Sequence, residues 1–113
     1  MGPLGHTAVS AAVGVGVGAA TGSPEAGGIA LGVGVLMDLD HLYDFYEWYI
    51  RGRSKRVYLL GHAWEYSAAG LVVLASVFFH PFLLAAVLAH LAHVTADQVH
   101  NRLPPFSYVY RLV

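Results

Sequence analysis

Cysteine is absent from the chain, and charged residues are scarce. The 113 residues contain no cysteine, which excludes disulfide bonds, thiolate zinc sites and cysteine nucleophiles. Asp, Glu, Lys and Arg together make up 12% of the chain, whereas an ordinary soluble domain contains about 25%. The net charge of −1 argues against a broad nucleic-acid-binding surface, and we therefore expect no nucleic-acid partner.

Apolar residues take the place of the missing charges. They form 57% of the sequence, and the mean hydropathy is +0.57. This composition indicates an integral membrane protein whose first partner is the lipid bilayer, and the length suits a single domain over residues 1–113. The N-terminus lacks the basic segment of a cleaved signal peptide, so we expect it to belong to the fold.

Four apolar segments predict four helices, over about residues 4–20, 24–50, 61–79 and 82–101, followed by a tail at 102–113. Gly22-Ser23-Pro24 and His80-Pro81 mark two of the turns between them. Each apolar stretch approaches the roughly 20 residues that cross a bilayer. The sequence therefore predicts an all-α, integral membrane four-helix bundle.

The basic residues predict how this bundle is oriented. All of them lie in the connection between the second and third helices or in the tail: Arg51, Arg53, Lys55, Arg56, Arg102 and Arg111. Because cytoplasmic loops of membrane proteins are enriched in Lys and Arg, this distribution places the connection and both termini in the cytoplasm. We therefore expect a multi-pass protein of the inner (cell) membrane.

Acidic and imidazole side chains gather toward the same cytoplasmic end. Of the Asp, Glu and His residues, only Glu25 and His80 map to the opposite side. Along the fourth helix, one arc of roughly 80° contains the side chains of His90, His93, Asp97 and His100. Burying such a stripe in an apolar protein is costly unless something pairs with it. A metal site facing the cytoplasm is the simplest partner.

The spacing of these residues suits metal ligation. His93-x-x-x-Asp97 places two donors on one helical face, and His62-x-x-Glu65 does the same on the third helix. Asp40 and His6 supply further donors from the second and first helices. Without thiolates, imidazole and carboxylate ligands favour a divalent metal such as zinc, as one ion or two, with iron or manganese as alternatives.

Other polar residues have supporting roles in this interpretation. Glu65 and Asp38 are candidates for the catalytic residue that transfers the proton of an activated water. His90 lies deepest and is expected to donate a hydrogen bond to a ligand. His41 and His100 are additional candidate ligands, although a helical Asp38 and His41 would point away from Asp40 by roughly 160° and 100°.

Several motifs resemble a known family. The segments G-V-L-M-D-L-D-H, G-H-A-W-E-Y-S and A-H-V-T-A-D, after an early His-Thr, resemble membrane-bound, metal-dependent hydrolases of the LexA-regulated type. That family is distantly similar to zinc-dependent phospholipases C, and the resemblance covers about residues 5–100. It implies zinc ligation by His6, Asp40, His62, His93 and Asp97, with Asp97 bridging two ions.

The favoured function is metal-assisted hydrolysis of a phosphoester, such as a phospholipid or another small amphiphile. A di-iron or di-manganese oxidoreductase is one alternative, because His62-x-x-Glu65 and Asp97-x-x-His100 partly match the Glu-x-x-His motifs of such bundles. A metal-binding or metal-transport protein is another, disfavoured because the far halves of the helices carry few polar groups. Assembly into a homo-oligomer stays open.

Overall fold

The computed structural model describes residues 3–52 and 60–101, and every element in these two ranges is helical. In chain order the elements are α1 (Pro3–Thr21), α2 (Pro24–Met37), α3 (Leu39–Phe45), the π-helix η1 (Tyr46–Ile50), the 3₁₀ turn η2 (Leu60–His62), α4 (Trp64–Ser76) and α5 (Pro81–Asn101). The predicted all-α class is thus confirmed for the described ranges. The predicted tail at 102–113 and the basic residues other than Arg51 lie outside them.

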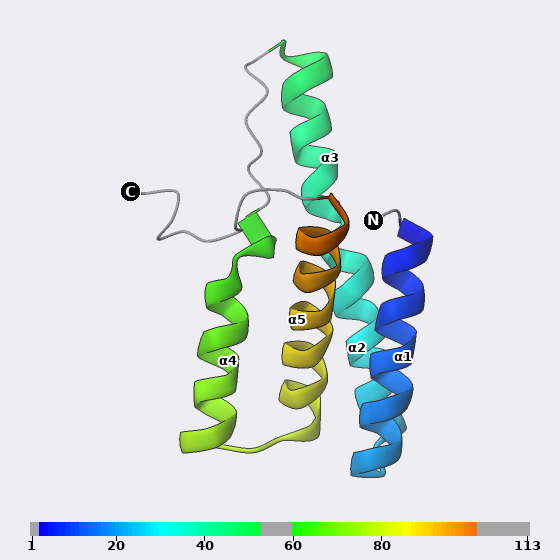
Figure 1. Cartoon of the computed structure of the whole chain (residues 1–113), viewed down its shortest axis with the longest axis vertical. Helices are drawn as coiled ribbons and strands as arrows, with labels where there is room; N and C mark the ends of the chain where they lie inside the picture. The colour runs from blue at the N-terminus through cyan, green and yellow to red at the C-terminus, as the bar shows by residue number, and fades with distance from the viewer. Residues whose placement is uncertain (1–2, 53–59, 102–113) are drawn as a thin grey trace.

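Helices α1, α2, α4 and α5 run alongside one another, and α3 continues beyond one end of this bundle (Figure 1). The turn between α1 and α2 follows directly from its sequence. Gly22 takes a φ of 68°, which a residue without a Cβ adopts at little cost. Ser23 then caps α2 by accepting a hydrogen bond from the Ala26 N–H, and Pro24 occupies the first turn.

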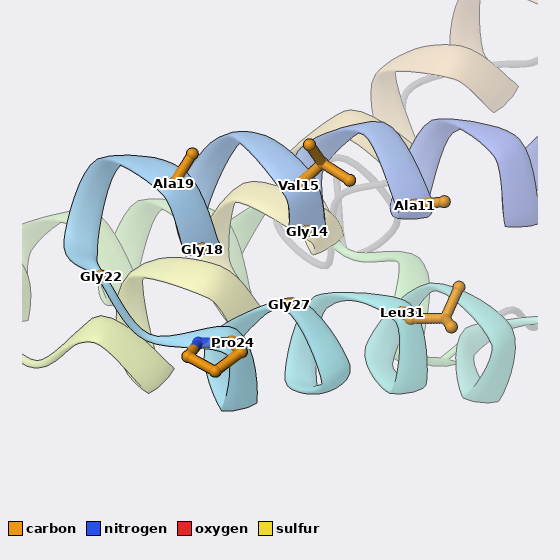
Figure 2. A pocket seen from close by; sticks show the side chains of 9 residues that line it. All are labelled: Ala11, Gly14, Val15, Gly18, Ala19, Gly22, Pro24, Gly27 and Leu31. Carbon is orange, nitrogen blue, oxygen red and sulfur yellow. The ribbon is translucent and has the colours of Figure 1, made fainter.

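Glycine allows α1 and α2 to approach closely. A Cβ on Gly14 would lie 2.7 Å from the Gly27 carbonyl oxygen, and one on Gly27 would lie 3.2 Å from the Gly14 carbonyl oxygen. The two backbones therefore touch at this point, as small residues permit in membrane bundles. Small side chains along both helices leave a shallow apolar groove on the outer side of this contact (Figure 2).

The core of the bundle is narrow and built mostly from alanine. Val17, Ala26, Ala30, Ala85 and Ala89 are buried together where α1, α2 and α5 meet. α4 packs on the other side of α5. This second contact is also close, because a Cβ on Gly70 of α4 would lie 2.3 Å from a methyl carbon of Val87.

The predicted second helix, 24–50, is divided into three pieces. α2 ends at Met37, Asp38 forms a turn, and α3 begins at Leu39. After Phe45 the helix widens into η1, a π-helix. Asp38 keeps helical dihedral angles, with φ −65° and ψ −14°, and Asp38 and His41, three residues apart, still lie on the same side.

The predicted third helix is shorter at both ends than expected. α4 begins at Trp64 and ends at Ser76, whereas the apolar pattern extends over 61–79. Ala63 is extended, with φ −71° and ψ 130°, and separates η2 from α4. His62 and Glu65 consequently do not share a helical face.

Two of the described helices, α1 and α5, are long and apolar enough to cross a membrane. α2 and α4 have 14 and 13 residues, or about 21 and 20 Å at 1.5 Å per residue. A hydrocarbon core is about 30 Å thick. Two candidate spans are weak evidence for a membrane protein, and they do not confirm the four predicted spans.

Candidate metal centre

Four separate segments bring imidazole and carboxylate groups together at one end of the bundle. This end contains the start of α1, the break between α2 and α3, the turn η2 and the C-terminal half of α5 (Figure 1). The six residues that meet there, called the His–Asp cluster below, are His6, Asp38, His41, His62, His93 and Asp97.

Asp97 lies at the centre of the His–Asp cluster and is only 1% exposed. One of its oxygens, Oδ1, is 2.9 Å from His6 Nε2. The other, Oδ2, is 3.6 Å from His62 Nε2, 3.8 Å from His93 Nε2 and 3.9 Å from His41 Nε2. A single buried carboxylate therefore faces four imidazoles, which come from four different segments.

Asp38 supplies a second carboxylate to the same cluster. Its Oδ1 atom lies 3.6 Å from His93 Nε2, 3.9 Å from His41 Nε2 and 4.0 Å from His6 Nε2. Although Asp38 precedes α3, its side chain makes no capping hydrogen bond to that helix. The carboxylate is turned toward the histidines instead.

Every histidine of the cluster presents the same ring atom, Nε2, to these carboxylates. The rings of His6 and His93 stack with centroids 3.8 Å apart, and both Nε2 atoms lie within 4.0 Å of Asp38 Oδ1. His62 Nε2 lies 3.1 Å from His93 Nε2, and His62 Nδ1 lies 3.3 Å from Asp40 Oδ2. Because the Asp40 carboxylate accepts a hydrogen bond from Nδ1–H, the Nε2 atom of a neutral His62 keeps its lone pair for the cluster.

The residues present fit a divalent metal. Two groups have ligand atoms that all lie within 4.8 Å of one another: His6, His93 and Asp97, and His41, His62 and Asp97. A tetrahedral zinc ion with bonds of about 2.1 Å separates its ligand atoms by about 3.4 Å. Most imidazole–carboxylate separations here are 3.6–4.0 Å, too long for good hydrogen bonds and close to that spacing. A dication would also offset the two neighbouring carboxylates.

A series of hydrogen bonds outside the cluster lies on the Nδ1 side of His62. The Gly61 N–H donates to Asp40 Oδ2, the same oxygen that faces His62 Nδ1. The Gly61 carbonyl accepts from His90 Nε2 at 2.8 Å, and His90 Nδ1 lies 2.6 Å from Ser67 Oγ. Asp40 and His90 thus hold the turn η2 from two sides.

The structure brings most of the predicted ligands together. From the predicted second helix, however, Asp38 and His41 enter the cluster in place of Asp40. His6, His62, His93 and Asp97 meet as the sequence predicts. Asp40 lies behind His62 and outside both groups, and His90 donates to a backbone carbonyl and not to a ligand.

The remaining candidates differ in position. Among the residues that the structure describes, Glu65 and His100 belong to neither group of potential ligands. Glu65 is in the first turn of α4, and His100 is exposed in the last turn of α5.

Farther from the cluster, Arg51 Nη1 lies 3.2 Å from Glu47 Oε1, and this hydrogen bond raises the pKa of Arg51 above its ordinary value.

Sequence reasoning underestimated Asp38 and His41 and did not assign Ser67 or Gly61 a supporting role. Asp38 and His41 were expected to point away from Asp40, and they do, but they face the cluster while Asp40 faces the Nδ1 side of His62. The choice of Asp40 as the ligand was therefore the part that differs from the structure. Asp is a residue that commonly precedes a helix, so Asp38 offered a signal for a new start at Leu39. No local pattern indicates that Ser67 and Gly61 would meet His90.

Comparisons of this chain with family models, curated proteins and solved structures find no match.

Proposed function

We propose that the chain is a membrane-embedded, metal-dependent hydrolase whose metal is held by the His–Asp cluster. The observation that carries this proposal is the position of the buried Asp97 carboxylate within 3.9 Å of the Nε2 atoms of four histidines. The sharing of Asp97 by both groups of potential ligands supports a centre with two ions. In such centres the ions are about 3.5 to 4 Å apart and share a carboxylate.

Divalent ions bound here, with zinc the first choice, would polarise a phosphoryl oxygen and lower the pKa of a bound water to about 7. The chain's own residues hold and orient this chemistry. Asp97 and Asp38 lie between the imidazoles of the cluster, which suits both carboxylates to ligation. Glu65, which is not part of the His–Asp cluster, is the remaining candidate for the residue that accepts the proton of the attacking water.

The accessible edge of the cluster points to an amphiphilic substrate. His6, His62, His93 and Asp97 are all buried, whereas the His41 side chain is 46% exposed. A substrate therefore reaches the cluster from the side of His41. Leu39 and Leu42, which flank His41 on α3, are more than half exposed and make this approach apolar. A phosphoester with an acyl or alkyl chain, such as a phospholipid, suits both the metal centre behind His41 and the apolar approach to it.

The membrane placement belongs to the same proposal. In it, α1 and α5 cross the bilayer, α2 crosses together with α3 and η1, and α4 crosses with its flanking residues. Large apolar side chains exposed at Val15, Leu36, Val72 and Val99 support contact with lipid. The basic connection after η1 supports a cytoplasmic position for the cluster in an inner membrane. The resemblance to LexA-regulated-type hydrolases favours the same arrangement.

Elemental analysis of the purified protein in detergent tests the proposal most directly. We expect zinc or another divalent metal in the wild type, and hydrolysis of a short-chain phospholipid that stops when a chelator removes the metal. Asp97→Asn, which preserves shape but removes the charge, should lose most of the metal and lower turnover at least 100-fold. His100→Ala is the matched control, because His100 is exposed and outside the cluster, and it should keep both.

The outcome also separates the alternatives. Hydrolysis that persists in metal-free protein would contradict the mechanism. Bound iron with an oxygen-sensitive absorption band, without hydrolysis, would instead favour the di-iron oxidoreductase. Circular dichroism of Asp97→Asn should match the wild type, so that loss of metal is not loss of fold.

A further inference from the structure

The turn η2 is too short to orient a metal ligand by itself. It has three residues, and the extended residue Ala63 separates it from α4. A 3₁₀ turn of this length contains little internal hydrogen bonding. His62, at its end, is nevertheless fully buried in the cluster. Something outside the turn must therefore fix the direction of this imidazole.

The two polar backbone groups of Gly61 provide that anchor. Its N–H donates to Asp40 Oδ2 on one side, and its carbonyl accepts from His90 Nε2 on the other. A side chain at residue 61 would displace the Asp40 carboxylate, because a Cβ there would lie 2.8 Å from Asp40 Oδ2. Asp40 and His90 thereby place the backbone immediately before His62.

The Gly61 carbonyl determines which nitrogen of His90 carries the proton, and Ser67 pairs with the other nitrogen. A neutral imidazole has one donor and one acceptor nitrogen. His90 Nε2 faces a carbonyl and must donate, so Nδ1 accepts the hydrogen bond from the Ser67 hydroxyl at 2.6 Å. Each hydrogen bond in the series from Ser67 through His90 and Gly61 to Asp40 then has one donor and one acceptor.

We propose that Ser67 and His90 are positioning residues, which fix the orientation and tautomer of His62 through the polar groups of Gly61 and the carboxylate of Asp40. This inference rests on the proposed metal centre and adds to it the residues that support one ligand. A serine beside a histidine is also the arrangement of a hydrolytic dyad, but Ser67 is 2% exposed and His90 is 9% exposed. Burial keeps substrate from Ser67 and leaves the supporting role.

Cobalt binding to the full chain in detergent tests this role, because Co²⁺ reports ligand geometry in its visible absorption. We expect Ser67→Ala and His90→Ala to weaken Co²⁺ binding about 10- to 100-fold and to change the spectrum, as loss of a ligand's supporting partner does. Ser67→Thr keeps a hydroxyl and should restore binding. Ser76→Ala is the matched control on the same helix, since Ser76 is exposed and its hydroxyl donates to the local Val72 carbonyl.

A double-mutant cycle shows whether the residues act through one series of contacts. The effects of Ser67→Ala and Asp40→Asn on Co²⁺ affinity should be less than additive, because both act on the orientation of His62. Affinities of Ser67→Ala and His90→Ala within twofold of the wild type, or strictly additive effects, would overturn the proposal.

Nitrogen NMR of the metal-free protein separates this proposal from the proposed function. We expect His62 as the Nδ1–H tautomer and His90 as the Nε2–H tautomer in the wild type, with the His62 signal altered in Ser67→Ala. The opposite tautomers would overturn the positioning role, whatever the activity. Absence of hydrolysis with normal Co²⁺ binding would contradict the hydrolase proposal alone.

Discussion

Asp97 joins the two groups of potential ligands, whereas each histidine of the cluster belongs to one of them. His6 and His93 lie in the first group, and His41 and His62 lie in the second. If each group holds an ion, changing a residue in one group should remove that ion and leave the other. The histidines therefore provide a means of counting the metals.

His6→Gln and His41→Gln should each reduce the metal content from about two ions per chain to about one. The reason is that each substitution removes an imidazole from a different group while Asp97 stays in place. Plasma mass spectrometry with quantitative amino-acid analysis measures the ratio. His80→Gln, at the turn before α5, should leave the number of metal ions per chain unchanged. One ion in the wild type, lost in both variants, would establish a mononuclear centre instead.

Residue chemistry was the part of the site most accessible from the sequence. The requirement that buried imidazoles and carboxylates find partners identified His6, His62, His93 and Asp97, and all four meet. Asp40 was assigned to the same shell because its depth along the second helix matched. Depth does not fix direction, and the Asp40 side chain faces η2 and the Nδ1 side of His62.

At the level of elements, the number of apolar segments was predictable, and their ends were not. Breaks at Asp38 and Ala63 fall inside stretches whose composition continues to favour helix. Both breaks lie beside the cluster, where contacts distant in sequence outweigh local preference. Asp38 and His41, three residues apart, face the cluster together, whereas Asp40 faces η2. The angles between these residues were predictable, but which of the two faces would meet the cluster was not.

The α1–α2 contact gives a prediction at this scale. Gly14→Ala should destabilise the protein by about 1–3 kcal/mol, because its methyl group would lie 2.7 Å from a backbone oxygen that cannot move aside. Gly16→Ala should stabilise it by about 0.4–1 kcal/mol, since nothing lies within 4 Å of the added carbon and alanine favours helix. Thermal unfolding in detergent measures both. Equal changes in stability for Gly14→Ala and Gly16→Ala would show that the helices are not in contact at Gly14.

For the whole molecule, the position of the cluster along the bundle matters most. From Asp38 to the start of α2 is 14 residues, or about 21 Å. In a hydrocarbon layer of about 30 Å, a bundle whose far end meets the opposite interface would place the cluster below the near headgroups. In the proposed membrane placement, that depth would favour a substrate that already resides in the membrane.

Orientation can be tested with single cysteines, because the chain contains none of its own. Phe79 before α5 and Ile50 at the end of η1 are both well exposed. In intact cells, a membrane-impermeant maleimide should label Phe79→Cys, whereas Ile50→Cys should react only after permeabilisation, because the basic connection favours the cytoplasm. The unmodified chain is the unlabelled control. The reverse pattern would invert the proposed topology.

The order of the potential donors along the chain limits when a metal could be bound in the proposed centre. The first donor is residue 6 and the last is residue 97, and α5 carries a member that both groups require. A nascent chain still lacking α5 has neither set complete. If the cluster holds metal as proposed, complete loading would therefore follow synthesis of the final helix.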